Sequence, residues 1–197
     1  KIDLGDYYLM QGEVWESSLL YSQVDKEMKD APLGEMARYK NAKLSYYKGD
    51  FDWAQDQLDI LKGSTSELIS NDAIDLSVFI LEHYALDTSA RPMLLFAHAD
   101  LLIFQNKFEA AISLMDSILL LNKDHGLGDD ILTAKAEIAY RKRDFTKAVG
   151  LLERITKEYE DGILVDNAIF KMAKIYEDRL SNPEKAMALY EQILFDF

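Results

Sequence analysis

The residues of this sequence that could do chemistry are three histidines, many carboxylates and one loop that contains glycine. His83, His98 and His125 are isolated, since no two of them lie four residues apart and no HExxH motif occurs. This spacing indicates no zinc site, and we expect His98 to be a core or groove histidine. The chain has no cysteine, which excludes a disulfide framework, a thiolate metal site and a cysteine nucleophile.

The segment DHGLGDD, residues 124–130, combines glycines with carboxylates as phosphate-binding and calcium-binding loops do. It lacks GxGxxG and GxxxxGK[ST], and no Glu closes a calcium loop. We therefore expect Gly126 and Gly128 to end one helix, and Asp129 and Asp130 to cap the next one.

Other charged clusters also fit structural roles. Close carboxylates such as Glu177 and Asp178 are expected by chance among 35 Asp and Glu residues. The cations of YRKR, residues 140–143, suit a helix C-terminus, where the helix dipole favours positive charge. There is no GxSxG motif. We predict a protein that is not an enzyme and that has no catalytic residue, no metal site and no cofactor.

Composition narrows the class of partner. The formal net charge is −13, so nucleic acid and anionic membrane surfaces are not expected partners, because phosphate binding needs a basic surface. The most apolar stretch, PMLLFAHADLLIF at 92–104, is too short to span a bilayer and contains His98 and Asp100. We therefore predict no direct membrane insertion. Only nine Gly and three Pro argue against disorder and against a turn-rich all-β fold.

A repeated phrase organises the chain. It reads YYKGDFDWAQDQL from 46, IFQNKFEAAISLM from 103, YRKRDFTKAVGLL from 140 and LMQGEVWESSLLY from 9. Its turn contains a large apolar residue (Val14, Phe51, Phe108, Phe145), and a small residue follows three positions later (Ser17, Ala54, Ala111, Ala148). Gaps of three and four residues mark one face of a helix, and the small residue allows a second helix to pack closely.

Each copy is preceded by another helical pattern with its own small residue (Ala42, Ala99, Ala136, Ala173), and the last copy places Ala186 in its second helix. The sequence therefore predicts an all-α fold of about five helix–turn–helix repeats in one domain over 1–197. The expected repeats are 1–33, 34–63, 89–125, 126–162 and 163–197. The chain starts at Lys1 and ends within a helical pattern, so we expect it to be a piece of a longer protein.

The interval 64–88 is about one helix longer than the repeat requires, and we predict an inserted helix there. Ser64 and Glu67 have the spacing of a capping box. An apolar helix face is predicted from the spacing of four residues (Ile74, Val78, Ile80, Leu81). The insertion could bend the solenoid, form a special site or merely pack.

These small positions and GDF-type turns resemble those of the tetratricopeptide repeat family over nearly the whole chain. The usual Trp early in the first helix is absent, and the period of 37 residues between Phe108 and Phe145 exceeds the common 34. The resemblance implies a right-handed α–α superhelix that acts as a protein-interaction scaffold. Such long repeats look like those of bacterial cell-envelope proteins, which favours the periplasm or cell envelope over the cytoplasm.

In the resembled family, first helices line a concave groove that holds a partner segment. Transferred repeat by repeat, the groove residues here would be Met36, Tyr39, Lys43, Tyr46, Met93, Phe96, Asp100, Asp130, Thr133, Glu137, Tyr140, Asn167, Phe170 and Lys174. The family's Lys/Asn/Arg set for a C-terminal carboxylate does not reappear, so we expect a basic or apolar protein or peptide partner. Self-association through exposed repeat faces is a further expectation. The alternatives are a solenoid that senses a peptide or small ligand, and a regulatory part of a larger enzyme.

Overall fold

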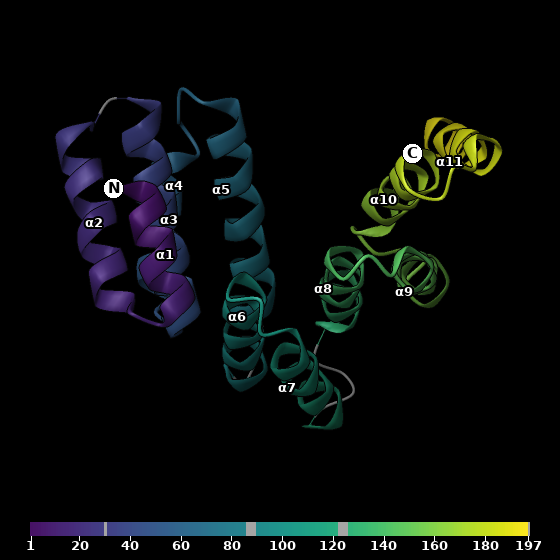
Figure 1. Ribbon diagram of the computed structural model, residues 1–197, viewed down its shortest axis with the longest axis horizontal. Coiled ribbons are helices and arrows are strands. Elements are labelled where there is room, and N and C mark those ends of the chain that lie inside the picture. The colour runs from purple at the N-terminus through teal and green to yellow at the C-terminus, as the bar shows by residue number, and fades with distance from the viewer. Residues whose placement is uncertain (30, 86–89, 122–125, 197) are drawn as a thin grey trace. The chain divides into compact units, whose positions relative to one another are not determined.

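The computed structural model describes residues 1–29, 31–85, 90–121 and 126–196, and within these ranges the protein is all-α, without a strand (Figure 1). The chain forms two compact units, Lys1–Lys123 and Asp124–Phe197, and each is described by itself. The all-α prediction is thereby confirmed. The predictions of a single domain and of a right-handed superhelix describe the arrangement of the whole chain, and they stay predictions.

The first unit contains two helix pairs, the inserted helix and a third pair. Its elements are α1 (Ile2–Gln11), α2 (Val14–Glu27), α3 (Pro32–Lys48), α4 (Phe51–Leu61), α5 (Glu67–Ile80) with the π-helical turn η1 (Leu81–Ala85), α6 (Arg91–Phe104) and α7 (Phe108–Leu121). Neighbours in sequence pack on each other from α1 to α5, as do α6 and α7, and α6 also packs on α3.

The second unit consists of two helix pairs. Its helices are α8 (Gly128–Arg141), α9 (Phe145–Glu158), α10 (Val165–Asp178) and α11 (Pro183–Asp196). Helix α9 packs on both α8 and α10, and α10 packs on α11 (Figure 1). The first helices of the two pairs, α8 and α10, therefore both pack on α9. This arrangement places α8 and α10 around the candidate site.

The repeated phrase marks the start of the second helix in each pair. Val14, Phe51, Phe108 and Phe145 are the first residues of α2, α4, α7 and α9. The predicted small residues of both helices are buried: Ser17, Ala42, Ala54, Ala99, Ala111, Ala136, Ala148, Ala173 and Ala186. Their predicted role in close helix packing is confirmed, since a small side chain lets two backbones approach.

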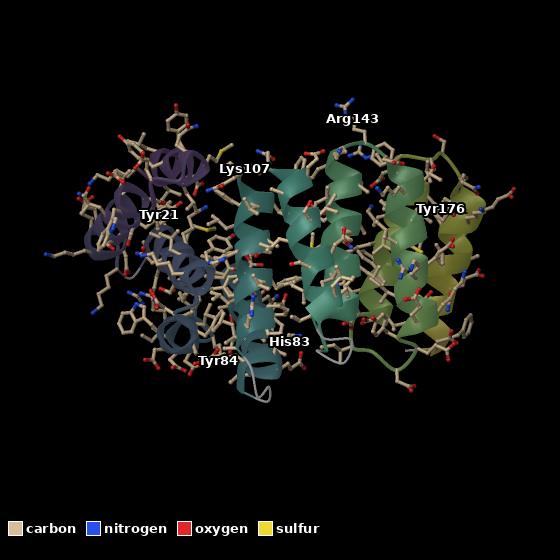
Figure 2. The ribbon with its side chains drawn as sticks, turned by 90° about the horizontal axis from the view of Figure 1, so that it is seen from below. Tyr21, His83, Tyr84, Lys107, Arg143 and Tyr176 are labelled. Atoms are coloured by element: carbon tan, nitrogen blue, oxygen red, sulfur yellow. The ribbon has the colours of Figure 1, made fainter. Side chains whose placement is uncertain are left out.

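The helix–turn–helix corners share one backbone conformation. The residue two positions before each second helix has a positive φ, and it is Gly12, Gly49, Asn106, Arg143 or Ser181. At the α8–α9 corner the N–H of Arg143 donates to the Tyr140 carbonyl and that of Asp144 to the Ala139 carbonyl, both at 2.9 Å. These bonds satisfy the last carbonyls of the helix. Arg143 holds this conformation without glycine's freedom, and its side chain extends away from the ribbon (Figure 2).

The predicted capping box of the inserted helix is wrong. Helix α5 begins at Glu67 after an N-cap Ser66 that makes no side-chain cap bond. The Ser64 hydroxyl instead donates to Glu35 Oε2 at 2.7 Å, and the N–H of Thr65 donates to the same carboxylate at 3.1 Å. These hydrogen bonds lower the pKa of Glu35, and the bond from Ser64 has the largest effect. The predicted end of the insertion, at residues 86–88, lies outside the described residues.

The predicted apolar face of α5 is only partly correct. Ile80 is buried as expected, but Ile74, Val78 and Leu81 are exposed. The face that packs consists of Ile69, Ala73, Ser77 and Ile80. Helix α5 carries apolar residues on two sides, and its contacts with α3 and α4 select which side is buried.

The glycine-containing loop before α8 is also partly as predicted. Gly126 has a positive φ of 70°, as expected of a helix-breaking residue. Gly128, however, is the first residue of α8, and Leu127 is its N-cap. Asp129 and Asp130 therefore lie in the first turn, where the helix dipole favours their charge, and do not cap the helix.

A candidate partner-binding groove

An open cavity of about 240 Å³ lies between α8 and α10 in the second unit. Its lining comes from α8, α9 and α10 and comprises Thr133, Ala136, Glu137, Tyr140, Leu152, Phe170, Lys171, Lys174, Ile175 and Asp178. Five of these residues were predicted as groove residues from the sequence: Thr133, Glu137, Tyr140, Phe170 and Lys174. The structure thus brings five of the fourteen predicted site residues to one cavity.

Helix geometry explains the convergence. Thr133, Glu137 and Tyr140 are spaced by four and three residues, so they share one face of α8. Phe170, Lys174 and Asp178 are likewise spaced by four along α10. The buried residues Ala136, Leu152 and Ile175 supply apolar surface to the cavity.

The apolar rings of the groove are held by neighbouring side chains. The Tyr140 ring contacts Phe145 at 5.4 Å between ring centres, and the Arg179 guanidinium lies over both rings at 5.6 and 5.9 Å. Arg179 Nε also donates to the Tyr140 hydroxyl at 3.0 Å. Phe170 contacts the Tyr190 ring of α11 at 6.0 Å but is 51% exposed. The groove therefore has one fixed ring and one ring that faces solvent.

Most charges at the rim are paired within the unit. Arg141 Nε lies 2.7 Å from Glu137 Oε1. Lys174 Nζ lies 3.3 Å from Glu177 Oε2 and 3.4 Å from Asp178 Oδ2. Exposed ion pairs of this kind add little to the stability of the fold. They do fix the positions of the charged groups around the apolar residues of the cavity.

Lys171 differs from the other charged residues of the lining. Among the residues that the structure describes, it is the lining cation that makes no ion pair. The residue as a whole is exposed, yet burial around its ammonium group lowers its pKa, and the Glu137 charge opposes that effect. Lys171 therefore lines an open groove without an ion pair among the described residues, and its amine can donate to a ligand.

The other predicted residues of the second unit lie beside the cavity. Asn167 lines a small adjoining cavity of about 10 Å³ together with Thr133 and Lys171. Asp130, in the first turn of α8, is partly buried.

Three predicted groove residues of the first unit lie in its core. Tyr46 and Met93 are 1% and 0% exposed, and Phe96 is also buried. Phe79 of α5 contacts the rings of Tyr46 and Phe96 at 6.2 and 5.3 Å between ring centres. The inserted helix therefore covers Tyr46 and Phe96, two side chains that the repeat pattern placed in a groove.

The four remaining predicted residues stay partly accessible: Met36, Tyr39, Lys43 and Asp100. Burial raises the pKa of Tyr39 to about 12, the Lys43 charge opposes this, and the charges of Asp72 and Asp100 add to it. Lys43 Nζ lies over the Tyr47 ring at 5.6 Å. Met36 belongs to a separate cavity of about 560 Å³ that α1, α2 and α3 line.

Sequence reasoning did not predict five of the lining residues: Ala136, Leu152, Lys171, Ile175 and Asp178. Of these, Ala136 was predicted only as a small residue in helix packing. Leu152 and Ile175 read as ordinary core positions, because burial and exposure to a cavity have the same sequence pattern. Lys171 could have been found, since Asn167, Lys171 and Lys174 have the spacing of one helix face.

The described residues bring no group of metal ligands together at this groove. In the described ranges, no three His, Cys, Asp or Glu residues lie close enough to hold a metal ion. His83 packs on Phe79, and His98 is exposed on α6, so it is not a core residue. Its expected place in a groove stays a prediction. His125 lies outside the described residues. No described helix combines the length and apolar character needed to cross a bilayer.

Comparisons of the chain with protein-family models, with curated proteins and with solved structures gave no match. A functional assignment therefore depends on the sequence pattern and on the geometry of the site.

Proposed function

We propose that this protein is a non-catalytic interaction scaffold of the tetratricopeptide-repeat type, and that the groove between α8 and α10 holds a segment of a partner protein. The observation that carries the proposal is the convergence of Thr133, Glu137, Tyr140, Phe170 and Lys174, chosen by repeat position alone, on one cavity.

The size of the cavity favours a side chain over a small-molecule ligand. Pockets for drug-sized ligands usually measure about 300–1,000 Å³, and this cavity has about 240 Å³. An apolar side chain of the partner would contact Tyr140, Leu152, Phe170 and Ile175. Aromatic rings at the centre of such a contact supply a large share of the binding free energy.

Charge further defines the partner. The rim pairs neutralise one another locally, so the segment in the groove needs no high charge of its own. The protein as a whole carries a net charge of −13, and a negative field slows the approach of acidic partners. We therefore propose a basic or apolar partner.

The test is a selection of random peptides on the full chain, followed by affinity measurements on groove variants. Phe170→Ser is the main variant, because an exposed ring can be removed with little loss of stability. Ile163→Ser is the matched control, since Ile163 is also an exposed apolar residue of the second unit but does not line the cavity. We expect Phe170→Ser to weaken selected peptides by about tenfold or more, which is about 1.4 kcal/mol, and Ile163→Ser to leave them unchanged.

Two outcomes would contradict the proposal. One is an equal loss of affinity in both variants at unchanged melting temperature, which would mean that binding is not at the groove. The other is a selection that yields no peptide with saturable binding.

A further inference from the structure

Helix α5 and the η1 turn that continues it present an apolar stripe to solvent, about a quarter turn around the helix from the packed face. Ile74, Val78 and Leu81 are spaced by four and three residues, so they lie in one row. They are 40%, 40% and 46% exposed. The packed face of the same helix is complete without them, as Ile69, Ala73, Ser77 and Ile80 are buried. The stripe is therefore apolar surface that the fold of the first unit does not use.

Two carboxylates lie beside this stripe, one on α5 and one on η1. Asp75 follows Ile74 directly, and Glu82 follows Leu81 directly, so the two acids occupy matching positions two helical turns apart. Both are exposed.

Helix α4 adds a carboxylate where it packs against α5. Gln55 of α4 donates from Nε2 to the Ser77 hydroxyl of α5, and the same Nε2 lies 3.2 Å from Asp59 Oδ1. Ser77 precedes Val78 in sequence. Asp59 therefore lies where α4 packs against α5.

The charge of this region is almost entirely negative. Residues 51–85 contain seven carboxylates, namely Asp52, Asp56, Asp59, Glu67, Asp72, Asp75 and Glu82, and their only Lys or Arg is Lys62. Lys62 Nζ lies 2.7 Å from Asp59 Oδ1 and so is already paired. The field over the stripe thus attracts cations, and an apolar row flanked by carboxylates matches an apolar row flanked by Lys or Arg.

We propose that the outer face of α5 is a docking site for a basic amphipathic helix of a partner protein. Its apolar residues would pack on Ile74, Val78 and Leu81, and its flanking cations would pair with Asp75 and Glu82. A second copy of this chain is a poor occupant, since α5 against α5 would bring carboxylates together. An anionic membrane surface is repelled for the same reason.

This inference is independent of the groove between α8 and α10, because the two surfaces share no residue. Failure of one leaves the other untouched.

The test uses designed peptides and fluorescence anisotropy on the full chain. The probe is a helical peptide of about 18 residues whose leucines recur at gaps of three and four and are flanked by lysines. One control peptide has the same composition in scrambled order, and another has glutamates in place of the lysines. We expect the probe to bind at least about tenfold more tightly than either control peptide.

Protein variants locate the binding. We expect the triple variant Ile74→Ser/Val78→Ser/Leu81→Ser to weaken the probe by about tenfold or more, and Leu194→Ser, an exposed control on α11, to have no effect. Asp75→Asn/Glu82→Gln should weaken the probe by about threefold and flatten its dependence on salt between about 0.05 and 0.3 M. Circular dichroism spectra of each variant serve as the control for folding.

Equal binding of the probe and the scrambled peptide would overturn the proposal, as would equal binding of the probe by wild type and the triple variant. Sedimentation that shows self-association lost in the triple variant would also overturn it, because the occupant would then be a second copy.

Discussion

The two units use the same helix pair but treat its first-helix face differently. Tyr46 and Tyr140 each lie five residues before the phenylalanine that starts the next helix. Tyr46 is buried against Phe79 of the inserted helix, whereas Tyr140 lines an open cavity and is covered on one side by Arg179. The repeat phrase therefore determines where a side chain stands on its helix, and a neighbouring element determines whether it remains accessible.

The comparison also concerns the role of the insertion. Phe79 closes the face of the first unit by contacting Tyr46 and Phe96, and the same helix exposes a new apolar stripe beside its packed face. In the first unit, the inserted helix thus covers the rings of Tyr46 and Phe96 and exposes the apolar stripe of Ile74, Val78 and Leu81. The second unit keeps the surface that its repeats create.

The largest expected effect comes from removing the ring that closes the first unit. Phe79→Ala should lower the free energy of unfolding by about 2–3 kcal/mol, because it leaves a cavity between Tyr46 and Phe96. The matched change Phe170→Ala in the second unit should cost less than about 1 kcal/mol, since that ring is half exposed. Urea unfolding of the full chain measures both. Similar costs would mean that the two faces do not differ in packing.

The next effect is a loss of stability at alkaline pH that originates in the first unit. Burial raises the pKa of Tyr39 in the folded protein to about 12 from its ordinary value of 10.0, so folding disfavours its ionised form. Its contribution is fully present below pH 10 and is lost as the pH rises towards 12, by about 1–2 kcal/mol in total because the ring is only partly buried.

Tyr39→Phe has no proton to lose at this position. We expect its free energy of unfolding to fall less than that of the wild type between about pH 9.5 and 11.5. Burial and the Asp6 hydrogen bond also raise the pKa of Tyr21, and this contribution is common to both proteins. Parallel pH profiles for wild type and variant would show that Tyr39 is not a source of the loss.

The smallest expected effect on stability comes from a helix–turn–helix corner at which the two units have different residues. The first unit has Gly49 at a corner with positive φ, and the second has Arg143 at the equivalent corner. Arg143→Gly should raise the free energy of unfolding by about 0.5–1 kcal/mol, because glycine adopts this conformation without strain.

Arg143→Ala is the control for charge, since it removes the guanidinium but keeps a Cβ in the same conformation. We expect it to leave the stability within about 0.3 kcal/mol of wild type. A gain in the alanine variant equal to that in the glycine variant would attribute the effect to charge repulsion with Arg141 and Lys142, and not to the backbone.

Local features of the fold could be predicted from the sequence. The positions of the turns before α2, α4, α7 and α9 and the buried small residues followed from turn chemistry and helical spacing. Both depend on residues that are close in sequence.

Features that depend on distant residues could not be predicted. Ser64 does not cap α5 because Glu35, 29 residues earlier, accepts its hydrogen bond. The wrong apolar side of α5 was expected because a helix with two apolar stripes gives no local sign of which stripe is buried. The groove residues of the second unit were found because no inserted helix covers them there, whereas the cover over Tyr46 comes from a segment that the repeat pattern does not contain.

The most direct measurement for the groove is an amide chemical-shift titration of the full chain with a peptide selected as described above. We expect the largest shifts at Thr133, Lys171 and the neighbouring residues of α8 and α10, with saturation at the affinity found in solution and with no comparable shifts in α5. Shifts that centre on α3, α5 or α11, or that spread evenly over both units, would contradict the proposal that the open face between α8 and α10 binds the partner.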